Sequence, residues 1–271
     1  MIIMDKSVEN FNTRLRTIKI RELIVGLIVA LIFTGIMTAI FPVIESDDDL
    51  FMIVLLIAIL LFFVFCLWNT RGIDRNFESL FNNNLNEIFY VFAINMIFAF
   101  LFVFFISMID LFIGMTDPSW VTGFDIDSVD LTPGAFFFSL IASIIFAPLL
   151  EELIFRGVIF NRLKIRMGII PAMLISSFIF AIGHDFGGIT SAFLFGLCMC
   201  ILYLKTDNIF VPMAVHFINN VTATLLEIIN IDAIVTQIPW LFLLGIITLI
   251  GTVLLIKYII DETSILKNSY R

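Results

Sequence analysis

The chain has 271 residues, of which 61% are hydrophobic and 14% are charged, with a mean hydropathy of +1.12 and a formal net charge of −8. A soluble domain carries roughly 25% charged residues, and a water-soluble globule of this size could not cover so much apolar side chain, 32 Phe included. This composition argues against a soluble enzyme, a disordered protein and a secreted disulfide scaffold, and the absence of a basic face argues against nucleic-acid binding.

The apolar runs predict an all-α fold, a polytopic transmembrane helix bundle of about eight spans, since a bilayer requires about 20 apolar residues per helix. In chain order the runs are 22–44, 50–68, 88–113, 135–160, 168–184, 189–204, 209–229 and 238–260. The fifth and sixth runs are short, and a tight turn, Asp185-Phe186-Gly187-Gly188, separates them. The cysteines Cys66, Cys198 and Cys200 lie within such runs, where we expect them to pack as small apolar side chains.

The basic residues predict the orientation of the chain in the membrane. Of the 15 Lys and Arg residues, all but Arg156 fall in segments that an eight-span chain places on one side, and cytoplasmic loops are enriched in Lys and Arg. The intervening loops, such as 45–49 and 110–134, contain acids and no base. We therefore expect both termini in the cytoplasm. The first apolar run is too long for a secretory signal and is expected to be an uncleaved span.

A few polar residues interrupt the predicted spans. An ionisable side chain there costs about 2.5–3.5 kcal/mol on insertion scales, so such residues are rare and usually functional. They are Glu151, Glu152 and Arg156 in the fourth run, His184 at the end of the fifth, and His216 and Asn220 in the seventh. This set includes both histidines of the chain.

Helical spacing separates the two glutamates. Glu152 and Arg156 are four residues apart with the acid first, the favourable order for an ion pair, and we expect a buried pair that positions the helix. Glu151 is rotated by about 100° from Glu152, so it lacks a basic partner on its own helix. It is therefore the candidate general base. The alternative is that both glutamates serve only packing or pairing.

His216 and Asn220 are also four residues apart and share one helix face. A neutral imidazole can bind a water, a metal ion or a developing oxyanion, and an Asn amide can donate to an oxyanion; the alternative for a membrane His is an interhelical hydrogen bond. Phe180, one turn before His184, is expected to pack beside that imidazole. The helical rise places Glu151 and His216 at similar depth but His184 nearer the outer face, so convergence requires tilt or a deeper start of the fifth span.

One carboxylate, two imidazoles and one amide suit hydrolysis of an amide bond by water. Glu151 would take a proton from water, the histidines would orient the water, and Asn220 would stabilise the oxyanion. The sequence requires no cofactor. The alternative is a divalent metal such as zinc held by Glu151, His184 and His216, because Glu with two His is a hydrolytic zinc ligand set. The helical H-E-x-x-H pattern of soluble zinc proteases is absent.

Three motifs in this order resemble a known family. Glu-Glu-x-x-x-Arg at 151–156, Phe-x-x-x-His at 180–184 and His-x-x-x-Asn at 216–220 are similar to those of the CAAX protease and bacteriocin-processing family, also called CPBP or ABI. Its members are intramembrane endopeptidases, and its eukaryotic relatives are the type II CAAX prenyl proteases. The resemblance covers residues 136–226. The family was first described as metalloproteases, and its later mechanistic interpretation is glutamate-dependent without an obligatory metal.

The resemblance implies a role for each motif residue. Glu151 would activate water with the assistance of His184, and His216 and Asn220 would form the oxyanion side. The supporting residues would be Glu152, Arg156 and Phe180. It also implies three regions: N-terminal transmembrane helices of unassigned role at 1–134, a catalytic core at 135–230, and a last transmembrane helix with a cytoplasmic tail at 231–271.

The same resemblance implies a membrane-associated peptide or protein as substrate, and a role in bacteriocin immunity or in peptide and protein maturation. The Phe-, Ile- and Asn-rich composition indicates the plasma membrane of a low-GC prokaryote, with the lipid bilayer as the other partner. Two alternatives remain. One is a proton-coupled transporter that uses the buried Glu and His residues as a relay. The other is a non-catalytic immunity or scaffold protein of the same fold.

Overall fold

The computed structural model describes residues 7–116, 133–184 and 187–269. Within these ranges the regular secondary structure is helical, and six helices are long and apolar enough to cross a membrane. This confirms a polytopic transmembrane helix bundle, whereas the number of spans and the side of the termini remain predictions. Residues 117–132 of the predicted acidic loop, and Asp185 and Phe186 of the predicted turn, lie outside the described residues.

Each predicted span corresponds to a helix or to a continuous helical run. These are α2 (Ile20–Ile40), α4 (Asp48–Leu67), α6 (Leu85–Thr116), the run 133–167, α10 (Ile169–Ala181), α11 (Ile189–Thr206), α12 (Phe210–Ile228) and α14 (Ile238–Ser269). Two of them, α10 and α12, are not among the six: α10 has only 13 residues, and α12 includes His216 and two Asn residues. Among the described residues, three short helices connect spans: α3 (Pro42–Glu45), α5 (Ile73–Asn83) and α13 (Ile231–Val235). A fourth short helix, α1 (Phe11–Thr17), precedes α2.

The run 133–167 combines α-helical and π-helical segments without a break. Its parts are α7 (Pro133–Leu140), η2 (Ile141–Phe146), α8 (Ala147–Glu152), η3 (Leu153–Phe160) and α9 (Asn161–Met167). Pro148 lies two residues after η2, and because proline has no N–H and clashes with the carbonyl four residues earlier, it disturbs α-helical bonding at this point. π-helical turns are rare in proteins, but those that occur are often found at functional sites. Here they flank the short helix α8, which ends in the two glutamates.

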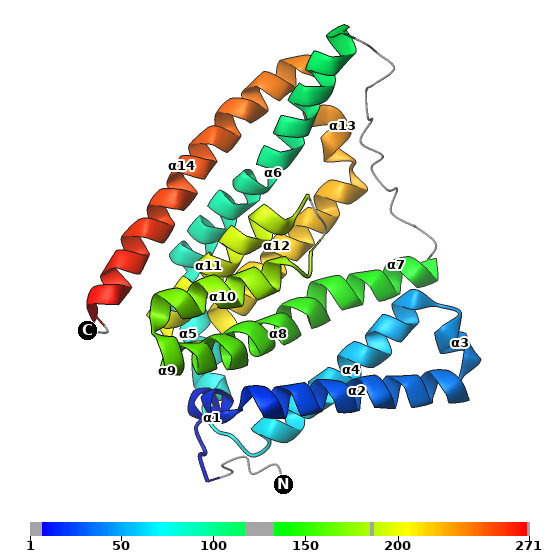
Figure 1. Cartoon of the computed structure of the whole chain (residues 1–271), viewed down its shortest axis with the longest axis vertical. Coiled ribbons are helices and arrows are strands. Elements are labelled where there is room, and N and C mark those ends of the chain that lie inside the picture. The colour runs from blue at the N-terminus through cyan, green and yellow to red at the C-terminus, as the bar shows by residue number, and fades with distance from the viewer. Residues whose placement is uncertain (1–6, 117–132, 185–186, 270–271) are drawn as a thin grey trace.

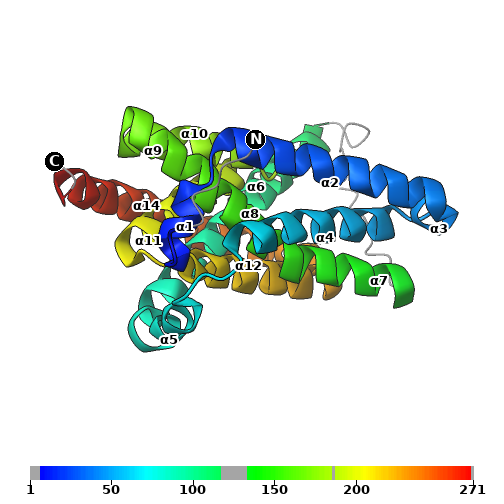
Figure 2. The same ribbon diagram turned by 90° about the horizontal axis from the view of Figure 1, so that it is seen from below.

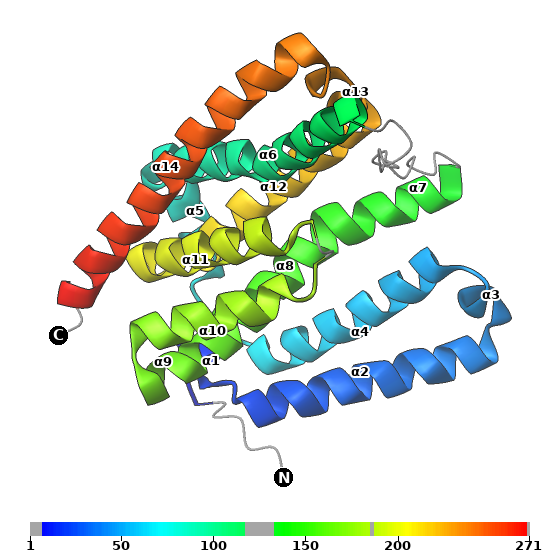
Figure 3. The same ribbon diagram turned by 45° about the horizontal axis from the view of Figure 1, so that its top comes forward.

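The spans form three groups (Figure 1). The hairpin of α2 and α4 lies at one side of the bundle, and the long antiparallel pair of α6 and α14 lies at the other. Between them lie the run 133–167, α10, α11 and α12, as a second view also shows (Figure 3). Of the six membrane-length helices, α11 is the most buried. The apolar side chains of α2 and α14 are largely exposed, as expected for helices that face lipid.

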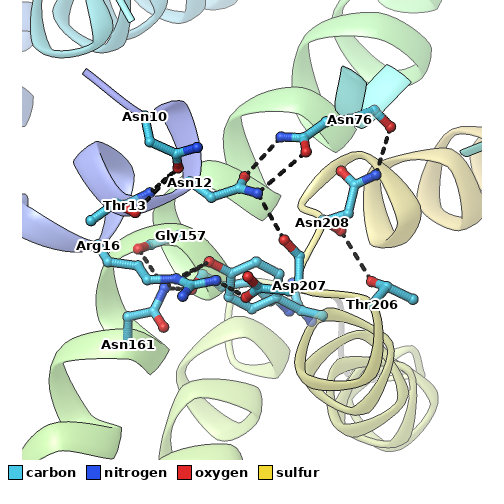
Figure 4. Close-up of polar contacts among 12 residues, drawn as sticks. Asn10, Asn12, Thr13, Arg16, Asn76, Gly157, Asn161, Thr206, Asp207 and Asn208 are labelled. Atoms are coloured by element: carbon cyan, nitrogen blue, oxygen red, sulfur yellow. Dashed lines mark hydrogen bonds and ion pairs between the residues drawn. The ribbon is translucent and has the colours of Figure 1, made fainter. Parts of the chain in front are cut away.

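The segments richest in Lys and Arg gather at one end of the bundle, where α1, α9 and the end of α14 lie (Figure 1). Seen from below, α5 at this end points along the line of sight while α2, α4 and α12 run across the view (Figure 2). Polar contacts fasten α1 across this end (Figure 4). Arg16 pairs with Asp207, and Asn12 donates to the Asp207 carbonyl oxygen at 2.8 Å. The opposite end holds α3, the start of α7, and α13.

Candidate active site

The buried pair expected from the sequence is present in the run 133–167. Arg156 Nη1 donates to Glu152 Oε1 at 2.9 Å, and neither side chain is exposed. Arg156 also donates through Nη2 to the carbonyl oxygen of Gly196 in α11, at 3.2 Å. Its guanidinium carbon lies 4.6 Å from the ring centroid of Phe180 in α10. One arginine therefore links the three helical segments that surround the site.

His216 bridges the two glutamates. Its Nδ1 lies 3.0 Å from Glu152 Oε1, and its Nε2 lies 3.7 Å from Glu151 Oε2. Because Glu152 is ion-paired with Arg156, its carboxylate accepts a hydrogen bond, and we assign the tautomer in which Nδ1–H donates to it. Nε2 then faces Glu151 with its lone pair. The expectation that Glu151 and His216 meet at the same depth agrees with this geometry.

Exposure distinguishes the two glutamates in the same way as helical spacing does. The Glu152 side chain has no accessible surface, whereas that of Glu151 is 32% exposed. Glu152 therefore pairs with Arg156 and His216, and Glu151 is the accessible carboxylate of the two. Both His216 and His184 are close enough to Glu151 to interact with its charge.

His184 lies in the turn that follows α10. Its Nδ1 is 3.1 Å from the carbonyl oxygen of Phe180, and its ring centroid is 4.7 Å from that of Phe180. The predicted packing of Phe180 beside His184 is therefore present, and the Phe180 ring also contacts His216, at 5.9 Å between centroids. α10 ends at Ala181 after 13 residues, a rise of about 20 Å. The rings of His184 and His216 both contact that of Phe180, although the helical rise alone had placed His184 nearer the outer face.

Asn220 faces the helix that carries the glutamates. Its Nδ2 donates to the carbonyl oxygen of Ser143 in η2, at 2.8 Å. An Asn side-chain amide has two N–H groups, and this bond uses one of them. Asn220 therefore joins α12 to the run 133–167 just before α8.

Two contributors to the site were not predicted. The ring of Phe195 in α11 lies 5.1 Å from that of His216, but one Phe among 32 gives no signal in the sequence. Gly196 provides the carbonyl oxygen that Arg156 binds, and a Cβ at this position would lie 2.9 Å from Cβ of Ser177. Small residues on two facing helices are the pattern that could have indicated this close approach of α10 and α11.

The alternative of a metal site was tested against the geometry. In the described ranges, no group of three or more His, Cys, Asp or Glu side chains is placed to hold a metal ion. The possible ligands Glu151, His184 and His216 do not form such a group. These side chains as arranged do not fit a three-residue zinc site.

Residues 133–222 match a family described as type II CAAX prenyl endopeptidase Rce1-like. Over 90 residues the chain is 36% identical to "Putative membrane peptidase YdiL" of Bacillus subtilis (strain 168), and over 97 residues it is 35% identical to "Membrane-embedded CAAX protease MroQ" of Staphylococcus aureus (strain USA300). Each match covers 33% of this chain, and 37% and 39% of the respective relatives. No solved structure gives a significant match.

The matched segment contains every candidate residue from Glu151 to Asn220. The match confirms the resemblance that the three motifs predicted. Both relatives are membrane proteins by name and come from low-GC bacteria, and with the apolar helices this confirms a multi-pass membrane protein of that origin. The chain matches little more than a third of the length of these relatives, so their activities are not transferred to it directly.

Proposed function

We propose that this chain, whose residues 133–222 match the type II CAAX prenyl endopeptidase Rce1-like family, is an intramembrane endopeptidase that cleaves membrane-associated peptides or proteins. The observation that carries this proposal is the bridge made by His216. A fully buried ion pair holds one nitrogen of its ring, and the other nitrogen faces the partly exposed Glu151 at 3.7 Å. A water molecule that lies between these two groups can contact both at hydrogen-bonding distance.

In this mechanism Glu151 is the general base. It accepts a proton from the water while the water oxygen bonds to the carbonyl carbon of the substrate, and His216 Nε2 orients the water. The resulting oxyanion is stabilised by Asn220, which keeps one free N–H group. His184 donates its Nδ1–H to the carbonyl oxygen of Phe180, so its Nε2 lone pair assists in orienting the water. The protonated Glu151 then gives its proton to the amide nitrogen as the C–N bond breaks. Glu152 and Arg156 do not touch the substrate and act by fixing His216.

The arrangement of Phe180 supports this assignment. Its ring lies between the two imidazoles and beneath the Arg156 guanidinium, so it fixes the spacing of three polar groups while keeping bulk lipid away from them. A site inside an apolar bundle suits a substrate that is itself held in the membrane. We propose peptide or protein maturation, or bacteriocin immunity, as the biological setting.

The proposal is tested with the full chain in lipid nanodiscs and a library of fluorogenic membrane peptides. Glu151→Gln keeps the size of the side chain but removes the base, and we expect cleavage to fall by about 10²–10⁴-fold. Glu45→Gln is the matched control, because Glu45 lies exposed in the short helix α3 at the far end of α2. It should cleave like the unchanged protein. Cleavage that survives Glu151→Gln would contradict the glutamate mechanism.

The same assay addresses the metal. We expect activity to persist after exhaustive chelation, with elemental analysis as a check. Loss of activity on chelation that added zinc restores would replace the glutamate mechanism by a metal-dependent one. If the unchanged protein cleaves nothing but dissipates a proton gradient in proteoliposomes, the transporter alternative takes its place.

A further inference from the structure

A cavity of about 200 Å³ lies between α6, α12 and α13. Its walls are apolar, with Met96, Phe100 and Val103 from α6 and Leu226 from α12. Pockets that hold drug-sized ligands measure roughly 300–1,000 Å³, so this cavity has the size for a single long side chain. α13, which contributes Ile231 and Asp232 to the lining, lies at the end of the bundle opposite α1 and α9 (Figure 1).

Two carboxylates line this apolar cavity, Glu227 at the end of α12 and Asp232 in α13. Residues 85–116 and 206–256, which include all three lining helices, contain no Lys or Arg. Among the described contacts neither carboxylate has a side-chain hydrogen bond or an ion pair. Asp232 is half-buried, and its burial raises the pKa of this carboxyl above its ordinary value. A carboxylate that is desolvated without a partner is unfavourable, and a cation in the cavity would relieve this.

The cavity continues the face of α12 that carries the candidate site. Ala223 and Glu227 follow His216 by seven and eleven residues, and helix geometry puts each of them within about 20° of the direction of His216. Asn220 lies on the same face. Glu227 is about 16 Å from His216 along the helix axis, a distance that an extended peptide spans with about five residues.

We propose that this cavity is a specificity pocket for a basic side chain, Lys or Arg, of the substrate peptide, about five residues from the bond that is cleaved. This inference rests on the proposed endopeptidase function and names a substrate class for it. The apolar walls receive the methylene stem, and the carboxylates of Glu227 and Asp232 receive the charge, as is typical for long basic side chains.

Binding is measured apart from hydrolysis, with Glu151→Gln protein in nanodiscs of zwitterionic lipid. The probes are two labelled apolar hexapeptides that differ at one position, one with lysine and the other with its uncharged analogue norleucine. We expect the lysine peptide to bind at least fivefold more tightly. The additional substitutions Glu227→Gln and Asp232→Asn should remove this preference, and Glu227→Gln alone, at an exposed position, should reduce it without affecting folding.

The control is the double substitution Asp48→Asn and Asp49→Asn, which removes the same charge from the first turn of α4. It should leave the preference intact. Three results would each overturn the proposal. The two peptides could bind the unchanged pocket with equal affinity, the preference could survive without the carboxylates of Glu227 and Asp232, or the α4 control could lose the preference to the same extent. A lysine preference without cleavage by the unchanged protein would retain the pocket and remove the endopeptidase. Cleavage without the lysine preference would retain the endopeptidase function and remove the pocket.

Discussion

Arg156→Ala tests whether the buried charges position His216. The substitution removes the Nη1 bond to Glu152 at 2.9 Å, the Nη2 bond to Gly196 at 3.2 Å, and the contact with the Phe180 ring. It leaves Glu152 fully buried without its cation. Breaking a buried pair in this way costs about 3–5 kcal/mol, because one charge remains uncompensated. For a chain of this size, each kcal/mol corresponds to about 2–4 °C in the unfolding temperature.

We therefore expect Arg156→Ala to unfold on the order of 10 °C below the unchanged protein, with lower folded yield and lost activity. The measurement is intrinsic fluorescence during heating in detergent, at one fixed scan rate. The informative partner is the double variant Glu152→Leu with Arg156→Met, which replaces both charges by apolar side chains of similar volume and removes the acceptor for His216 Nδ1–H. Replacing a buried pair by groups of similar volume is often neutral for stability. This variant should recover the unfolding temperature but not the activity, because His216 has lost its carboxylate.

Two results would refute this reasoning. Normal stability of Arg156→Ala with lost activity would show that the pair does not hold the helices and that Arg156 takes part in the chemistry. Full activity of the double variant would show that Glu152 does not orient His216. Either result can be read without knowing the natural substrate, provided that one peptide from the library is cleaved.

Two further predictions concern the packing around this pair. Gly196→Ala should destabilise the protein by about 1–3 kcal/mol and lower activity, because its Cβ would lie 2.9 Å from Ser177 and would push α10 and α11 apart; Gly35→Ala, with nothing within 4 Å, is the control in the same thermal assay. Asn161→Leu should lower the unfolding temperature because it removes buried bonds to the carbonyl oxygens of Arg156 and Gly157, at 3.0 and 2.9 Å. Unchanged unfolding of Asn161→Leu would show that these bonds do not hold η3 in place.

The bundle could be predicted from the sequence because the bilayer imposes a length and a composition on each span. The short helices could not be predicted in this way. α1 and α5 form where polar segments meet the ends of the spans, and their positions depend on tertiary bonds such as that between Asn12 and Asn76, at 3.0 Å. The predicted fifth span extends to His184 whereas α10 ends at Ala181, because Ile182 and Gly183 continue the run by composition although the helix has already given way to a turn.

Within the site, contacts along one helix were predictable and contacts between helices were not. The pair of Glu152 and Arg156 follows from a spacing of four residues. The bond of His216 to Glu152 and that of Asn220 to Ser143 depend on how α12 is rotated against the run 133–167. A single sequence contains no measure of that rotation. The motifs therefore identified the side chains, and the structure identified which of them touch.

The two π-helical segments allow the run 133–167 to contain extra residues without a change in the direction of Glu151. A π-helical turn accommodates one residue more than an α-helical turn, and η2 lies between α7 and the glutamates. Loss of one residue from η2 together with a return to regular α-helical bonding would therefore leave α8 in nearly the same direction relative to α7. Glu151 would still point toward His216, so a search for active relatives should allow a gap of one residue within 141–146.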